Sequence, residues 1–192
     1  MKKSLGPKTL LYPTPVLIVG SYNADGTSNI MTAAWGGIAS SKPASLAVSI
    51  RSATATHGNI VQRKAFTISI PNESQVLEAD YAGLVSGREH NKMAELGLTP
   101  TPSELVDAPY ASEFPLVLEC RLVAVHDLGM HTQFIGEVVD VKADYTILNE
   151  GGGSVDVTLL RPIVYAVGTQ GYFGLGHHLG KAFEIGREAV EK

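Results

Sequence analysis

The 192-residue chain has one cysteine, no excess of basic residues and no long hydrophobic run. A single cysteine excludes a framework of intramolecular disulfides and is typical of the reducing cytoplasm, where we expect this protein. The net charge of −4 argues against a general nucleic-acid-binding surface, which is usually basic. No segment reaches the ~18 apolar residues that a membrane-spanning helix needs, so we expect no membrane partner.

Several motifs of common catalytic and binding sites are also missing. Neither GxxxxGK[ST] nor a strand-linked GxGxxG occurs, which excludes a P-loop and a Rossmann nucleotide site. No GxSxG is present, so we discount a hydrolase. The spacings of His126 and His131 and of His177 and His178 match no zinc motif, and we predict no metal site. Cys120 lies in an alternating strand pattern, which favours a buried apolar side chain over a redox thiol.

The order of apolar runs and turn residues predicts many short strands and few helices, which favours an antiparallel barrel over alternating βαβ units. We expect one domain over residues 1–192, with residues 171–192 as a C-terminal extension. The predicted strands cover residues 16–21, 28–35, 46–50, 66–70, 116–125, 133–142, 155–160 and 163–168. The predicted helices are one capped by Thr54 or Thr56, one over residues 73–84, a turn at 92–96 and one over 179–190.

Residues 29–57 combine small side chains with very little charge. Lys42 and Arg51 are the only charged residues of this stretch, which also holds the sole tryptophan, Trp35, and the pair Gly36-Gly37. A core would use larger side chains, and a solvated loop would carry more charge. Small residues beside one large aromatic indicate a place where the backbone approaches a flat, partly polar ligand.

The end of this stretch gathers donors for an anion within nine residues. Hydroxyl groups, a guanidinium and an imidazole come from Ser49, Arg51, Thr54, Thr56 and His57. Spacing alone fits two interpretations equally: a phosphate site, or solvated charges next to threonines that cap a helix. Taken alone, Trp35 fits a core aromatic better than a ligand contact.

Five short motifs, in this order and spacing, resemble the flavin-reductase-like, FMN-binding split-barrel family, and within it most closely the flavoredoxins. They are TAAW at 32–35, ASSKPAS at 39–45, VSIRSATATH at 48–57, NKM at 91–93 and HTQFIGEV at 131–138. The resemblance covers most of the chain, from about residue 12 to residue 173. It implies a mainly β, antiparallel Greek-key split β-barrel with a few peripheral α-helices.

The resemblance also implies FMN as the cofactor and a homodimer in which the flavin lies beside the subunit interface. Tyr172 and Phe173 would then contribute to the partner's site, and His131 would lie near the flavin and nicotinamide side. No side chain is identified as a proton-transferring base. The implied FMN contacts are Asn29, Met31, Thr32, Ala33, Ala34 and Trp35 at the ring end, and Ser49, Arg51, Thr54, Thr56, His57 and Lys92 at the phosphate end.

Two functions follow from the resemblance: an electron carrier like flavoredoxin, served by a redox partner protein, or an NAD(P)H-dependent flavin reductase. Many family members have an acidic residue where this chain has Met130, directly before His131, and this departure puts NAD(P)H use in doubt. The alternatives are a flavin oxidase like the pyridoxamine-phosphate oxidases, which would act on an amine, and a non-catalytic flavin-binding protein.

Overall fold

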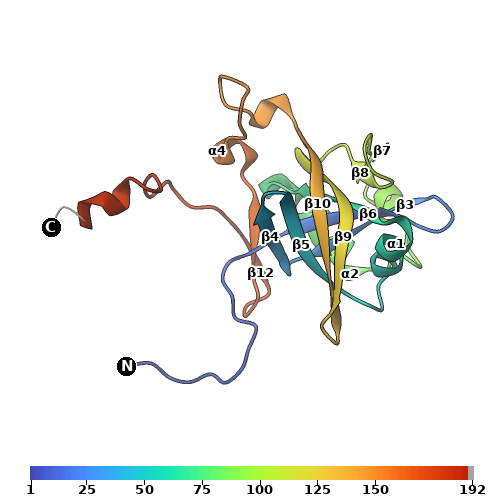
Figure 1. Cartoon of the computed structure of the whole chain (residues 1–192), viewed down its shortest axis with the longest axis horizontal. Helices are drawn as coiled ribbons and strands as arrows, with labels where there is room; N and C mark the ends of the chain where they lie inside the picture. Colours follow the sequence, from blue (N-terminus) through green and yellow to red (C-terminus); the bar gives the residue numbers. More distant parts are fainter. Residues whose placement is uncertain (190–192) are drawn as a thin grey trace.

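A seven-stranded antiparallel sheet forms the body of the molecule in the computed structural model, which describes residues 1–189 (Figure 1). The strands follow the order β3–β2–β6–β9–β10–β5–β4, so β3 and β4 are the two outer strands although they are neighbours in sequence. The sheet is therefore a barrel with a split. Its strands are β2 Leu17–Tyr22, β3 Ser28–Ala33, β4 Gly36–Ser41, β5 Ala44–Arg51, β6 Ala65–Ile70, β9 Leu116–Asp127 and β10 His131–Ala143.

Two small sheets and a few short helices surround this barrel. One sheet has the order β1–β11–β12, with β1 Thr14–Pro15, β11 Ile163–Ala166 and β12 Gly171–Gly174. The other pairs β7 Pro100–Pro102 with β8 Pro109–Ala111. The α-helices are α1 Ala55–Arg63, α2 Val76–Leu84, α3 Lys92–Glu95 and α4 Val157–Leu160, and 3₁₀ turns cover η1 Glu73–Gln75, η2 Tyr145–Ile147 and η3 Ile185–Ala189. The predicted mainly β split barrel with few peripheral helices is confirmed.

Strand β2 separates two hydrophobic clusters. Because successive side chains of a strand point to opposite faces, Val16 and Ile18 pack in one cluster and Leu17 and Val19 in the other. The first cluster joins the barrel to α2, α3 and β11. The second fills the barrel interior with Val48, Ile50, Ile60, Phe66, Ile68, Cys120 and Phe134. The elements around the split are thus held from both sides of one strand.

Cys120 is fully buried in the second cluster, as its alternating pattern predicts. Burial among apolar side chains raises the pKa of its thiol to about 12, since a thiolate loses its hydration there. The same region contains Gly136, where an added Cβ would lie 2.5 Å from the Phe66 ring and 2.9 Å from Cβ of Cys120. The barrel interior leaves no room for a side chain at that position.

Two predicted elements are wrong, in full or in part. Residues 155–160 were expected as a strand, but α4 begins after Asp156, whose carboxylate accepts a hydrogen bond of 2.7 Å from the Thr158 amide. This local capping bond stabilises a helical turn that the short apolar run alone did not indicate. The helix predicted over 179–190 is reduced to η3, because Phe183 has a positive φ of 64°, which interrupts a helix. The end of that predicted helix, at position 190, lies outside the described residues.

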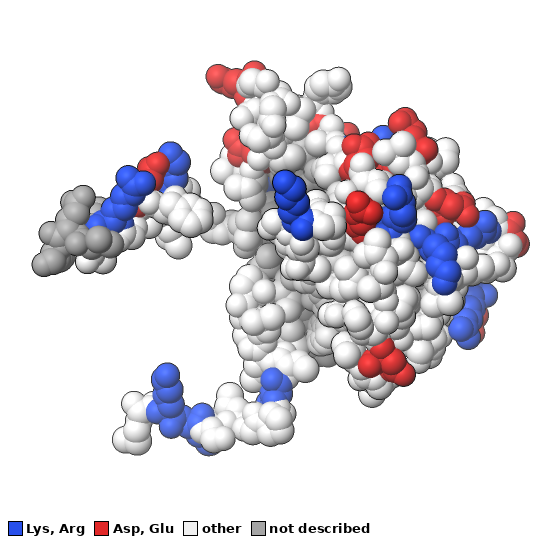
Figure 2. Space-filling model, viewed as in Figure 1, with Lys and Arg blue, Asp and Glu red and all other residues white. Residues whose placement is uncertain are grey.

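The N-terminal residues and the chain after β12 leave the barrel on the same side as two extended arms (Figure 1). Both arms carry exposed apolar side chains, among them Leu11, Leu179 and Phe183. Figure 2 shows few charged side chains on the part of the body from which the arms leave, whereas charges gather on the opposite side. Among residues 1–189, no helix is long and apolar enough to cross a bilayer.

Candidate functional site

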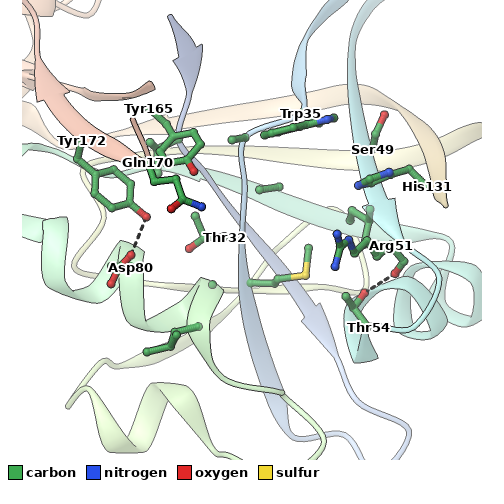
Figure 3. Close-up of a pocket in the computed structure, with 17 residues that line it drawn as sticks. Thr32, Trp35, Ser49, Arg51, Thr54, Asp80, His131, Tyr165, Gln170 and Tyr172 are labelled. Atoms are coloured by element: carbon green, nitrogen blue, oxygen red, sulfur yellow. Dashed lines mark hydrogen bonds between the residues drawn. The ribbon is translucent and has the colours of Figure 1, made fainter. Parts of the chain in front are cut away.

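A cavity of about 790 Å³ lies at the split, between the end of β3, the end of β5, helix α2 and the β11–β12 hairpin (Figure 3). This volume falls in the upper part of the usual range for ligand pockets, about 300–1,000 Å³. Its lining residues are Val16, Met31, Thr32, Ala33, Ala34, Trp35, Ser49, Ile50, Arg51, Thr54, Asp80, Gly83, Leu84, His131, Tyr165, Gln170 and Tyr172.

One wall of the cavity is the backbone of residues 31–35, where β3 ends and the chain turns into β4. The carbonyl of Trp35 accepts a hydrogen bond of 2.7 Å from the Ser49 amide, which fixes this turn against β5. On the other side, the Thr32 hydroxyl donates to the carbonyl of Ala79 in α2. Since Ala33 and Ala34 are small, the main chain itself forms much of the wall. A planar ligand can therefore approach peptide groups closely.

Trp35 is not a core aromatic. Its side chain is 37% exposed and lies at the rim of the cavity, where its ring stacks on the imidazole of His131. The ring centroids are 6.5 Å apart and the planes differ by 9°. The interpretation that Trp35 simply fills the core is therefore wrong, and a flat apolar surface faces the cavity.

Strand register brings the cationic end of the cavity together. Arg51 on β5 is paired with His131 on β10, and Ser49 lies on the same face as Arg51 because it is two residues away. Thr54 caps helix α1: its hydroxyl donates to the Arg51 carbonyl at 2.9 Å and accepts from the His57 amide at 3.2 Å. Among the side chains that the structure describes, no carboxylate lies close enough to the exposed Arg51 to form an ion pair. This end is suited to an anion.

The opposite end of the cavity carries Asp80 and Tyr165, which the sequence did not reveal, and Tyr172, which was expected at the partner's site but lines the cavity of its own chain. The Tyr172 hydroxyl donates a hydrogen bond of 3.0 Å to Oδ1 of Asp80, and the Tyr165 ring lies 5.6 Å from the Tyr172 ring at 51° (Figure 3). Burial, followed by the hydrogen bond to Asp80, raises the pKa of Tyr172 to about 12, so the phenol stays neutral. Gln170 completes this end. These residues come from α2 and the β11–β12 hairpin, far along the chain from the 29–57 motif.

Four of the predicted contacts lie outside the cavity lining. Asn29 is buried and donates to the Thr56 hydroxyl at 2.9 Å, and His57 lies 2.9 Å from the Thr132 hydroxyl. Lys92 is buried and donates to the Ala82 carbonyl at 2.6 Å. That these four touch a cofactor remains a prediction. The nine predicted residues that do line the cavity are Met31, Thr32, Ala33, Ala34, Trp35, Ser49, Arg51, Thr54 and His131.

Burial of Lys92 has an electrostatic consequence near the site. Without water around the ammonium group, the pKa of Lys92 falls to about 8. Its hydrogen bond to a helix carbonyl satisfies one of its three donors. Metal ligands do not gather in this region or elsewhere: among residues 1–189, no group of three or more His, Cys, Asp or Glu side chains is placed to hold an ion.

The fold and the cavity together define a class: an antiparallel split barrel whose open seam holds a cavity with a strand-edge wall, a flat aromatic and one cationic end. Within that class, the sequence model of the flavin reductase like domain matches residues 9–170. The chain belongs to this family, which confirms the resemblance drawn from the five motifs.

Solved structures agree with this assignment. The flavoredoxin of Desulfovibrio vulgaris (Miyazaki F) is 50% identical, covers 97% of this chain and 100% of its own, and superposes with a TM-score of 0.92. A flavoredoxin from Methanosarcina acetivorans is 26% identical, with 98% and 99% coverage and a TM-score of 0.91. An uncharacterized protein of Archaeoglobus fulgidus is 36% identical over 113 residues, which are 59% of this chain and 64% of that relative. The match therefore spans slightly less than two thirds of the relative's length.

Proposed function

We propose that this chain binds FMN at the split and serves as a cytoplasmic electron carrier of the flavoredoxin type. One observation carries the proposal: a single cavity joins the small-residue wall at 31–35 and the flat surface of Trp35 to the unpaired cation Arg51. A planar ring on an anionic tether matches both features. The 50% identity to a flavoredoxin over nearly the whole of both chains supports the same choice.

The cationic end would hold the phosphate. Arg51 supplies a guanidinium that can donate two parallel hydrogen bonds to phosphate oxygens, and Ser49 adds a hydroxyl. Thr54 caps the nine-residue helix α1, whose N-terminal amides and dipole favour a negative charge. Thr56 and His57 would act from behind this end, because their hydrogen bonds to Asn29 and Thr132 fix α1 against the barrel. Lys92 would act through α2, since it donates to the carbonyl of Ala82.

The ring end would be held mainly by main-chain groups. FMN supplies the redox chemistry when it is bound, and the protein positions its ring and controls access to it. The wall at 31–35 offers peptide donors and acceptors at close range because Ala33 and Ala34 have no bulk. The Trp35–His131 stack would add a flat aromatic surface beside the ring.

A carrier and an NAD(P)H-dependent reductase differ in how electrons arrive. His131 lines the cavity, as the resemblance to flavin reductases implies, and this observation favours the reductase as the second candidate. Met130, in contrast, is 67% exposed at the tip of the β9–β10 hairpin and offers no charge to a pyridine nucleotide. We therefore rank the carrier, reduced by a partner protein, above the reductase.

A homodimer is part of this proposal. The two arms expose apolar side chains, such as Leu11 on the N-terminal arm and Leu179 and Phe183 on the C-terminal arm, that the described residues leave largely uncovered. They leave from a side of the body that carries few charges, which is the composition expected of an interface between copies (Figure 2). Tyr172 lines the cavity of its own chain, whereas Phe173 is exposed and free to reach the partner.

Purified protein gives the test. A yellow protein whose released cofactor is FMN supports the proposal, and a protein that stays colourless after incubation with FMN and desalting rejects it. Under anaerobic conditions, bleaching by NADH or NADPH would favour the reductase. Bleaching only by a reduced iron–sulfur protein would favour the carrier. Turnover of an amine with oxygen would instead support the oxidase alternative, and a bound flavin that no donor reduces would indicate a simple flavin-binding protein.

A further inference from the structure

The cavity has opposite charges at its two ends. Among its lining residues, Arg51 carries a permanent positive charge and Asp80 is the only carboxylate. Figure 3 shows Arg51 and Thr54 on one side of the cavity and the Asp80–Tyr172 pair on the other, with Thr32 between them. One anionic group at Arg51 would neutralise that end, and the remaining cavity would then be negative.

Asp80 has no basic partner in the described part of the chain. Within residues 1–189, no Lys, Arg or His forms an ion pair with it, and its one hydrogen bond comes from the neutral Tyr172 hydroxyl. Oδ1 accepts that bond, which leaves Oδ2 free to accept another. Tyr172 stays protonated far above neutral pH, so it holds the carboxylate in place without adding charge.

Two aromatic rings stand beside this carboxylate. Tyr165 and Tyr172 lie 5.6 Å apart and are tilted by 51°, so they form two adjoining faces rather than a closed stack. Aromatic faces attract cations through their quadrupole, and angled aromatic rings with a carboxylate are a favourable setting for organic cations. Gln170 adds an amide that can donate or accept. An anion would be repelled by the carboxylate and by the electron-rich faces of the rings. Of these four residues, only Gln170, through its amide, and Tyr165, through its hydroxyl, could donate to an anion without giving up a bond to Asp80.

We propose that the Asp80 end of the cavity, formed by Asp80, Tyr165, Gln170 and Tyr172, is a second binding site that takes planar organic cations and rejects anions. It rests on the proposed function only in that FMN is taken to occupy the Arg51 end. The site selects the small molecules that can reach the cofactor by their charge. Cationic ligands lie over the tyrosine faces and pair with the free oxygen of Asp80.

A series of three ligands of one shape tests this site. Benzamidinium, benzamide and benzoate are planar and similar in size, and they carry charges of +1, 0 and −1 at neutral pH. Titration calorimetry of the flavin-loaded protein should give about tenfold tighter binding of benzamidinium than of benzamide, and no saturable binding of benzoate. Equal affinities for the cation and the neutral amide would overturn the proposal. The proposal would also be overturned if benzamidinium displaced the flavin, which ultrafiltration of the mixture would detect as free flavin in the filtrate.

Two variants test whether the preference for benzamidinium depends on the Asp80 carboxylate. Asp80→Asn should reduce the affinity for benzamidinium about tenfold, to that for benzamide. Glu89→Gln removes an exposed carboxylate outside the cavity and should leave the preference intact. An unchanged preference in Asp80→Asn would contradict the site, and the ligand series on the unaltered protein stands as evidence even if that variant does not fold. A flavin-loaded protein that does not prefer benzamidinium to benzamide and benzoate would contradict this inference alone. A protein that binds no flavin would contradict the proposed function.

Discussion

The indole of Trp35 and the imidazole of His131 lie nearly parallel, with ring centroids 6.5 Å apart and an angle of 9° between their planes. The pair joins the residue directly before β4 to the first residue of β10. His131 is also the register partner of Arg51, so one strand end connects the flat surface of the cavity with its cationic end. Removing the indole of Trp35 should affect ring binding, because the Ser49 and Arg51 side chains at the cationic end remain in place.

Replacing the indole should lower the affinity for FMN and the affinity for riboflavin by the same factor. Trp35→Ala removes an aromatic contact worth about 1–3 kcal/mol, which is roughly 5- to 150-fold in affinity. Because riboflavin has the same ring, fluorescence titration should show the same loss for both ligands. Trp35→Phe keeps a flat surface and should recover most of the affinity. A loss confined to FMN would contradict the placement of Trp35 beside the ring.

The stack itself can be followed without any ligand, because Trp35 is the only tryptophan of the chain. His131→Ala should move the tryptophan emission to longer wavelength, since water replaces the imidazole on one face of the indole. His126→Ala, an exposed histidine on the neighbouring strand, serves as the matched control and should leave the emission unchanged. Identical spectra for the two variants would show that the stack is not formed in solution.

The packing of the barrel interior gives a prediction on stability. Gly136→Ala places a methyl group within 3 Å of Phe66 and Cys120 and should lower the free energy of unfolding by about 1–3 kcal/mol. The control is Gly37→Ala on β4, where an added Cβ meets no atom within 4 Å. Urea denaturation of both variants gives the comparison. In the Gly136 variant, Phe66→Leu should restore part of the lost stability, and equal stabilities of the two alanine variants would refute this packing.

Much of the fold follows from local patterns, and so does one end of the site. Period-two alternation and turn residues locate the long strands, and Thr54 is readable as a cap because a short helical pattern follows it. The pairing of β5 with β10 places His131 next to Arg51 of the 29–57 stretch. Asp80, Tyr165 and Gln170 at the Asp80 end were missed because they lie on α2, on β11 and on the turn after β11, each with an ordinary sequence, and Tyr172 was expected only at the partner's site. Only the folded β1–β11–β12 sheet and α2 bring them together.

Lys92 illustrates a different limit of sequence reasoning. A lysine in a short helix is normally exposed, and nothing in the NKM motif shows that its side chain passes under α2 to the Ala82 carbonyl. Asn29 is similar: its buried amide bonds with Thr56 depend on how α1 packs on β3. Such tertiary contacts decide whether a polar residue supports a site from behind or faces the ligand, and no local pattern encodes them.

The buried lysine should make stability depend on pH. Its pKa is about 8 in the folded protein against 10.5 in water, so the folded state holds fewer protons than the unfolded state in that interval. The free energy of unfolding should therefore rise from pH 8 to 10.5, by up to about 1.4 kcal/mol per pH unit, and this contribution is lost as the pH falls through 8.

Denaturation of flavin-free Lys92→Met over the same pH range isolates this contribution. The difference between the unaltered protein and the variant should grow in favour of the unaltered protein as the pH rises. Lys8→Met, on the exposed N-terminal arm, should show no such difference. Parallel curves for the unaltered protein and Lys92→Met would contradict the burial of a poorly solvated ammonium group.

The role of Arg51 tests the central claim most directly, because only one of two otherwise identical ligands carries the phosphate. We would measure the dissociation constants of FMN and riboflavin for the flavin-free protein, for Arg51→Ala and for the control Arg88→Ala, an exposed arginine outside the cavity. Loss of a charge-assisted contact worth about 1.5–3 kcal/mol should weaken FMN roughly 10- to 150-fold in Arg51→Ala. Riboflavin affinity should not change, and Arg88→Ala should bind both ligands normally. Equal weakening of both ligands, or of neither, would show that Arg51 does not hold the anionic tether.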